Sequence, residues 1–182
     1  MKKVIFSLIL VVLLSSCQKE EPNNLPGYYD IISMESEIAL DLDGDGIAQK
    51  DLYDELLENN VEILNTHSTI GPKKEQPKSE KYMFFLGVYR QQYDKWSDNY
   101  YYGSGCMMCS YDFLPDGTLV VINDNYEFNS ERQGDIISLE WDGKDQLTGV
   151  FRLRYYIIEE DRWVSPLVTI VFQRVIVKGG DF

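Results

Sequence analysis

The segment LEWDGKDQL at residues 139–147 decides the fold class of this chain. It places an Asp-Gly pair between two apolar runs, and FLPDGTL at residues 113–119 repeats the arrangement. Asp-Gly readily adopts the positive backbone angles that a tight turn between two strands requires, so each segment predicts a β-hairpin. The two hairpins predict antiparallel β-structure in the second half of the chain.

Runs rich in apolar and β-branched residues predict further strands outside the two turns. We expect these strands at residues 28–38, 61–70, 82–89, 136–141, 147–159 and 167–177. One segment has a different period, because Leu52, Tyr53, Leu56 and Leu57 recur every three to four residues and predict a short amphipathic helix. About eight strands with short turns predict a mainly β fold, an antiparallel meander barrel or a sandwich, with one short α-helix. No internal repeat of useful length is evident.

The start of the chain has the pattern of an export signal. Two lysines, an apolar run at residues 4–14 and two serines precede Cys17. The run is too short to span a bilayer comfortably, and the arrangement is typical of a signal sequence. The ending LSSC at residues 14–17 resembles a bacterial lipobox, in which the signal is removed before an acylated cysteine. A simple secretory signal with an incidental cysteine is the alternative.

This interpretation divides the chain into three parts. We expect a signal peptide at residues 1–16, a lipidated tether at 17–26 and one β domain at 27–182. The formal net charge is −13 at pH 7. So acidic a chain repels phosphate backbones and anionic lipid headgroups, which argues against nucleic-acid binding and assigns membrane attachment to the acyl chains.

An acidic loop with the sequence DLDGDGIAQKDL at residues 41–52 carries the strongest ligand pattern. Asp41, Asp43 and Asp45 bring three carboxylates to one point, which is typical of a calcium-binding loop. We therefore expect a structural calcium ion held by these aspartates and by the carbonyl of Ile47. The alternative is a solvated acidic turn whose carboxylates accept hydrogen bonds from the backbone.

The closing ligand of this loop departs from the EF-hand pattern. The twelfth position, which is Glu in an EF-hand loop, is Leu52 here. Asp51, one residue earlier, is therefore expected either to close the calcium site or to cap the helix that follows.

Cys106 and Cys109 form a C-x-x-C pair. Neither a thioredoxin-like helix context nor a set of four zinc ligands accompanies them, so we expect a structural pair. The sequence leaves two alternatives open, a local disulfide or two half-buried thiols.

The lipobox, the Gly27-x-Tyr29 opening, the acidic loop running into DLYDEL at residues 51–56 and the first Asp-Gly hairpin together resemble the lipocalin-like lipoproteins of Bacteroidetes. The resemblance covers most of residues 27–177 and implies a small β-barrel on a lipid anchor. In addition, QKEE at residues 18–21 is similar to the signal that sends some lipoproteins of this phylum to the outer face of the outer membrane. An ordinary polar tether is the alternative.

Binding is favoured over catalysis. The single histidine, His67, has neither a G-x-S-x-G serine nor an evident partner, so we assign no catalytic residue. Trp96, Tyr100, Tyr101 and Tyr102 gather aromatic rings in an expected connection at residues 94–105, where they would stack on sugars or fill a barrel mouth unless they pack on the core. We expect a non-enzymatic protein for ligand binding or scaffolding, with a surface glycan-binding accessory module as the alternative.

Overall fold

The computed structural model describes residues 25–42, 45–57, 68–71, 82–94, 96, 99–114, 117–122, 134–157 and 160–176. The expected signal peptide and the tether up to residue 24 lie outside these residues, and so does Asp43. In the described part the chain is mainly β, its strands pair antiparallel, and one short helix accompanies them. The mainly β, antiparallel fold class is therefore confirmed.

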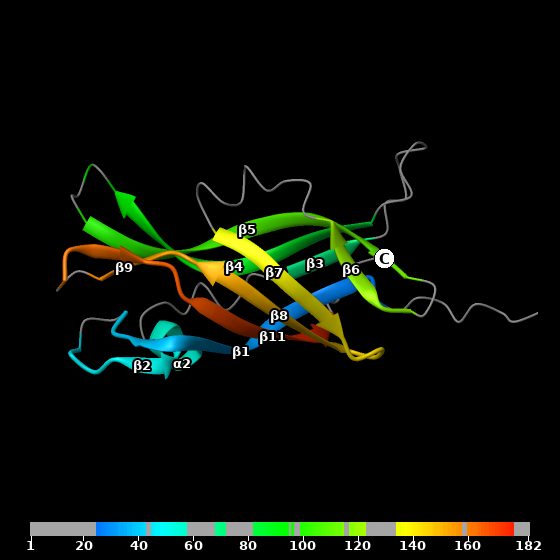
Figure 1. Cartoon of the computed structure of the whole chain (residues 1–182), viewed down its shortest axis with the longest axis horizontal. Coiled ribbons are helices and arrows are strands. Elements are labelled where there is room, and N and C mark those ends of the chain that lie inside the picture. Colours follow the sequence, from blue (N-terminus) through cyan, green and yellow to red (C-terminus); the bar gives the residue numbers. More distant parts are fainter. Residues whose placement is uncertain are drawn as a thin grey trace, which may run out of the picture.

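Figure 1 shows the order of the elements along the chain. They are β1 (Gly27–Leu40), β2 (Gln49–Asp51), α2 (Leu52–Leu57), β3 (Ser68–Gly71), β4 (Tyr82–Asp94), β5 (Asn99–Phe113), β6 (Leu119–Ile122), β7 (Gly134–Trp141), β8 (Gln146–Leu153), β9 (Tyr155–Ile157), β10 (Arg162–Val164) and β11 (Leu167–Val175).

Most strands belong to one nine-stranded sheet in the order β6-β5-β4-β3-β1-β11-β8-β7, with β2 added beside β1. Because β1 pairs with both β3 and β11, the first and last strands of the domain are neighbours. The two edge strands, β6 and β7, approach within 8 Å between Cα atoms. No backbone pairing joins β6 to β7 among the residues described.

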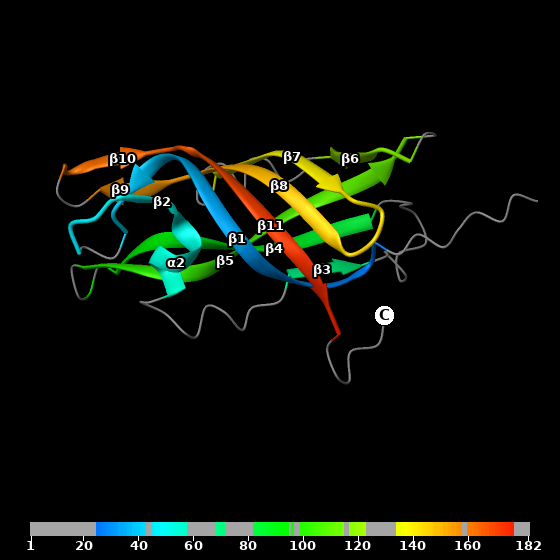
Figure 2. The ribbon, with the colours of Figure 1, turned by 90° about the horizontal axis from the view of Figure 1, so that it is seen from below.

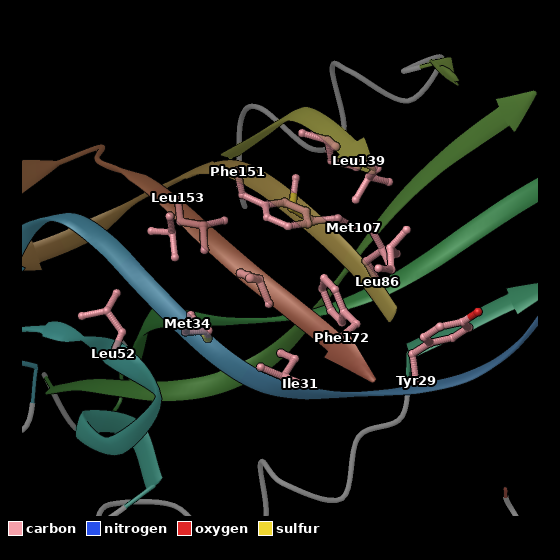
Figure 3. Close-up of a cluster of buried hydrophobic side chains, with 14 of the residues drawn as sticks. Tyr29, Ile31, Met34, Leu52, Leu86, Met107, Leu139, Phe151, Leu153 and Phe172 are labelled. Atoms are coloured by element: carbon pink, nitrogen blue, oxygen red, sulfur yellow. The ribbon is translucent and has the colours of Figure 1, made fainter. Parts of the chain in front are cut away.

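The sheet curls around a single core. Phe151 on β8 and Phe172 on β11 are fully buried, and Leu86 on β4 and Met107 on β5 belong to the same cluster. Four strands lie between β5 and β8 in the sheet order. Met107 and Phe151 therefore belong to the same core only because the sheet is rolled. Figure 3 shows these side chains converging between the strands, and Figure 2 shows β1 and β11 crossing in front of β4 and β5.

Both predicted hairpins are present. Gly117 and Gly143 have φ angles of 85° and 80°, the left-handed region that the Asp-Gly turns require. The N–H of Leu114 donates to the carbonyl of Thr118 at 2.9 Å, and the N–H of Asp142 donates to that of Gln146 at 3.1 Å. The sequence thus located both turns from local chemistry alone.

The carboxylate of Asp142 stabilises the second turn. Its Oδ1 accepts hydrogen bonds from the N–H groups of Lys144 and Gln146 at 2.8 and 3.1 Å. Desolvation alone would raise the pKa of Asp142, but the N–H groups of Gln146, Lys144 and Asp145 outweigh it and hold the pKa below its ordinary value.

The predicted helix is confirmed as α2, and the first strand as β1. Two predictions were wrong. Residues 99–105 belong to β5 and pair residue by residue with β4, so the tyrosine-rich connection is a strand. The long strand predicted at 147–159 ends at Leu153, and β9 pairs with β10 in a separate two-stranded ribbon. Of the strand predicted at 61–70, only residues 68–70 are described.

Candidate functional site

Three connections gather at one end of the molecule. Figures 1 and 2 both place α2 and β2, the turn between β4 and β5, and the β9–β10 ribbon at the same end of the long axis. Cα atoms of β4 and β9 come within 8 Å of each other. We call the described part of this region, which consists of residues 41, 42, 45–57, 96, 154–157 and 160–164, the loop end.

In the acidic loop, the carboxylates of Asp41 and Asp45 accept hydrogen bonds from backbone N–H groups of the loop itself. Oδ2 of Asp41 accepts a hydrogen bond from the N–H of Gly46 at 2.9 Å, and Oδ1 of Asp45 accepts one from the N–H of Ile47 at 2.7 Å. Gly46 makes the turn with φ 86°. These contacts are those of the acidic-turn alternative, and no group of three metal-ligating side chains forms in the part of the loop that the structure describes, which lacks Asp43.

The acidic loop leads directly into α2. Oδ1 of Asp51 accepts a hydrogen bond from the N–H of Tyr53 at 3.0 Å, the contact of a helix N-cap. Glu55 is buried, and its Oε2 accepts a hydrogen bond from the N–H of Leu42 at 3.4 Å. Of the two roles expected for Asp51, the structure shows the helix cap.

The β9–β10 ribbon carries an exposed aromatic and charged cluster that the sequence analysis missed. Trp163 lies opposite Tyr156, with ring centroids 5.4 Å apart, and keeps 45% of its surface exposed. The guanidinium carbon of Arg154 lies 4.9 Å from the Trp163 ring centroid. The hydroxyl of Tyr156 donates to the carboxylate of Asp161. We call Arg154, Tyr156, Asp161 and Trp163 the ribbon cluster.

A sequence signal for this ribbon existed. The acidic run EED at residues 159–161 separates two short aromatic segments, and Asp161 adopts φ 48° in the turn. The apolar run predicts a single strand at residues 147–159, which puts the acids at the end of that strand. The cluster combines a ring face, a cation and a carboxylate, groups that recognise polyhydroxylated ligands by stacking and hydrogen bonding.

Trp96 lies in the turn between β4 and β5 and is 88% exposed. The backbones of Tyr100, Tyr101 and Tyr102 lie on β5, opposite Tyr93, Gln92 and Gln91 respectively. Their side chains lie outside the described ones, so of the four aromatic residues predicted to bind a ligand, the structure describes the ring of Trp96 alone.

The disulfide alternative for the cysteine pair does not fit the strand. β5 pairs with β4 in unbroken register from Tyr111 back to Asn99, so Cys106 and Cys109 are three residues apart in a regular strand. Their Cα atoms are then about 10 Å apart, beyond the roughly 7 Å limit for a disulfide. Cys109 is a buried thiol outside any disulfide, and the side chain of Cys106 lies outside the described ones.

A pocket of about 350 Å³ lies between the two edge strands. It is lined by Gly117, Thr118, Leu119, Leu139, Glu140 and Trp141. The rings of Phe113 and Trp141 meet beside it with centroids 6.1 Å apart. This ring contact joins the end of β5 to β7 beside the pocket. No pattern in the sequence indicated the pocket.

Comparison of the chain with protein-family models, with curated proteins and with solved structures finds no significant match to any of them. Within the described residues, no helix is both long enough and apolar enough to cross a membrane.

Proposed function

We propose that this protein is a lipid-anchored lipoprotein of the outer membrane, exposed at the cell surface, whose lipocalin-like β-barrel binds a ligand or serves as a scaffold rather than catalysing a reaction. The observation that carries the proposal is the sheet order. Along the sheet, the eight strands run in chain order from β6 back to β1 and then from β11 back to β7. The pairing of β1 with β11 joins the first strand to the last. A barrel requires only that β6 also pairs with β7, whose Cα atoms already lie within 8 Å.

The loop end supports binding as the activity. In a barrel of this order, the connections at one end surround its mouth, where loops vary without disturbing the sheet. The buried side chains of β8 and β11, which include Phe151, Ile170 and Phe172, are apolar and suit packing rather than acid–base chemistry.

The anchor is tested by fractionating cells that express the full chain or its Cys17→Ala variant. The proposal predicts that the full chain stays with the outer membrane and that the variant is released. Protease added to whole cells should digest the anchored chain. Membrane association that survives Cys17→Ala would contradict the anchor, and protection in intact cells alone would contradict surface exposure.

Calcium bound to the acidic loop would brace the corner between β1 and α2. Asp41, Asp43 and Asp45 would supply carboxylate oxygens and Ile47 its carbonyl, the hard oxygen donors that calcium prefers. Binding to the folded state alone raises the melting temperature. The melting temperature of chelator-treated protein should rise when calcium is added, and Asp41→Asn with Asp45→Asn should abolish the rise, whereas Asp54→Asn on the exposed side of α2 should not. Identical melting with and without calcium would refute the site.

A glycan-binding module is the second candidate, and the exposure of Trp163 on β10 and of Trp96 in the β4–β5 turn, two elements of the loop end, favours it. An exposed indole stacks on sugar rings, and the carboxylate of Asp161 accepts hydrogen bonds from hydroxyl groups. A glycan array should show binding that Trp163→Ala and Trp96→Ala reduce, whereas Ile47→Ala, an exposed apolar control at the same end, preserves it. Binding that all three variants retain would place the sugar elsewhere and reject this site.

A further inference from the structure

The pocket between the two edge strands lies at the opposite end of the molecule from the loop end. Residues 117–119 lead into β6 and residues 139–141 end β7, so the pocket lies beside both Asp-Gly turns. Figures 1 and 2 both place β6 and the β7–β8 turn at the end of the long axis away from β9 and β10. We call this pocket, lined by residues 117–119 and 139–141, the seam pocket. Its volume of about 350 Å³ falls in the range of small-molecule sites, roughly 300–1,000 Å³.

A row of aromatic rings fixes one wall of the seam pocket. The half-buried ring of Trp141 meets Phe113 with an interplanar angle of 60°, and Phe113 meets Tyr111 at 89° with centroids 5.9 Å apart. Because Tyr111 is fully buried, this row anchors the indole to the core. Leu119 and Leu139 also line the pocket. The wall is therefore apolar and held in place, and it suits the apolar part of a ligand.

Glu140 is the charged residue that lines the seam pocket. Its side chain is exposed, and its partner on β8 is Thr148. The diagonal neighbours on β8, Gln146 and Val150, are also uncharged. No ion pair or hydrogen bond joins the Glu140 side chain to another of the residues that the structure describes. Its carboxylate is thus available to a ligand.

The charges around Glu140 make this end of β7 negative. Residues 139–146 carry three acids, Glu140, Asp142 and Asp145, and one cation, Lys144. The whole chain has a formal net charge of −13. A hollow lined by charge of one sign raises the local concentration of ions of the opposite sign. The seam pocket therefore favours a positively charged ligand.

We propose that the seam pocket binds a small organic cation, an ammonium group that carries a short apolar chain. The ammonium lies between the Glu140 carboxylate and the Trp141 ring, because the face of an indole attracts cations. A bare metal ion fits less well. Calcium takes about six to eight oxygen ligands, and the pocket supplies one carboxylate and the hydroxyl of Thr118.

This inference rests on the ligand-binding role proposed above. It gives that role a class of ligand and a site outside the loop end. The apolar chain of the cation would contact Leu119 and Leu139, which stand on the two edge strands. A bound cation would thus touch both β6 and β7, where the described residues show no backbone pairing.

NMR titration of the purified full-length chain with choline tests the proposal. The indole N–H of Trp141 is buried and has no acceptor among the described residues, and its signal, assigned with Trp141→Phe, reports on the pocket. Choline and n-butylammonium should shift this signal to saturation. The neutral carbon isostere of choline, 3,3-dimethylbutan-1-ol, should bind at least about tenfold more weakly, because it loses both the cation–π contact and the ion pair.

Two matched variants locate the charge that binds choline. Glu140→Gln should weaken choline binding about three- to tenfold, since it removes the carboxylate and keeps the shape of the side chain. Glu35→Gln is the control, because Glu35 is also exposed and also lies opposite a threonine, Thr169 on β11. It should leave choline binding unchanged. Circular dichroism checks that both variants are folded.

Three outcomes would overturn the proposal. The first is a Trp141 signal that neither choline nor n-butylammonium moves. The second is equal affinity for choline and its neutral isostere, which would indicate a neutral ligand. The third is equal weakening by Glu140→Gln and Glu35→Gln, which would show attraction to the acidic chain as a whole. The lipid anchor and the glycan site are tested separately by Cys17→Ala and by the glycan array, so their failure is distinguishable from failure here.

Discussion

Tyr29 on the first strand lies directly opposite Arg174 on the last. The hydroxyl of Tyr29 donates to the carbonyl of Leu25 at 2.8 Å, and the guanidinium of Arg174 donates to the carbonyl of Pro26. A side chain on Gly27 would meet the Arg174 guanidinium at 2.9 Å. Leu25 and Pro26, which lead into β1, are thus hydrogen-bonded by Tyr29 on β1 and by Arg174 on β11. These are the strands that pair the two ends of the domain.

Tyr29 makes stability depend on pH at the alkaline end. Burial raises its pKa above the ordinary 10.0, with Arg174 opposing the shift. The unfolded chain then loses this proton first, so the stabilisation is complete below pH 10 and is lost as pH rises towards the pKa of the folded state. Denaturant unfolding between pH 8 and about 11 should show a steeper loss in the wild type than in Tyr29→Phe. Parallel curves for the two proteins would show that Tyr29 does not carry the effect.

The Phe151–Phe172 pair is the most sensitive part of the core. Both rings are fully buried and meet at an interplanar angle of 67° with centroids 6.1 Å apart. Each Phe→Ala change should lower the free energy of unfolding by about 3–5 kcal/mol. A double-mutant cycle should give a coupling of about 0.5–1.5 kcal/mol, the usual value for an aromatic pair. A coupling of zero would mean that the rings do not touch in solution.

Gly149 is required because of its neighbours rather than its backbone angles. A Cβ at this position would lie 2.3 Å from the Phe151 ring and 2.8 Å from Leu139. Gly149→Ala should therefore cost about 1–3 kcal/mol through overpacking. Gly143→Asn is the control, because its Cβ meets nothing within 4 Å and asparagine tolerates a positive φ. Equal losses for the two variants would show that Gly149 is not packed this tightly.

The sequence predicted the features of the fold that depend on local chemistry. Asp-Gly located both turns, and the spacing of Leu52 and Leu56 located α2. It failed where long-range pairing decides the structure. Tyr100 to Tyr102 were assigned to a connection, because nothing local shows that β4 pairs with them across the turn at Trp96.

The candidate site was predictable in part. The acidic loop and its junction with α2 are set by adjacent residues, and the helix cap at Asp51 was one of the two roles expected. The ribbon cluster required knowing that the chain leaves the main sheet after Leu153, which the apolar run through residues 147–157 concealed.

Asp51 should stabilise α2 as its N-cap. Asp51→Ala removes the acceptor for the N–H of Tyr53 and should cost about 0.5–2 kcal/mol. Asp54→Ala, which removes an exposed acid from the same helix, should cost less. The comparison is made by urea unfolding without calcium. If the two variants lose equal stability, the cap is not formed.

Hydrogen exchange at β6 and β7 tests the lipocalin-like barrel most directly. If the barrel is closed, the amide N–H groups of β6 and β7 that do not donate to β5 or β8 form hydrogen bonds between β6 and β7. Their exchange should then be slowed to a degree comparable with the amides between β1 and β11. Exchange of those amides at the rate of an unstructured chain, while β1 and β11 stay protected, would show an open sheet and contradict the barrel.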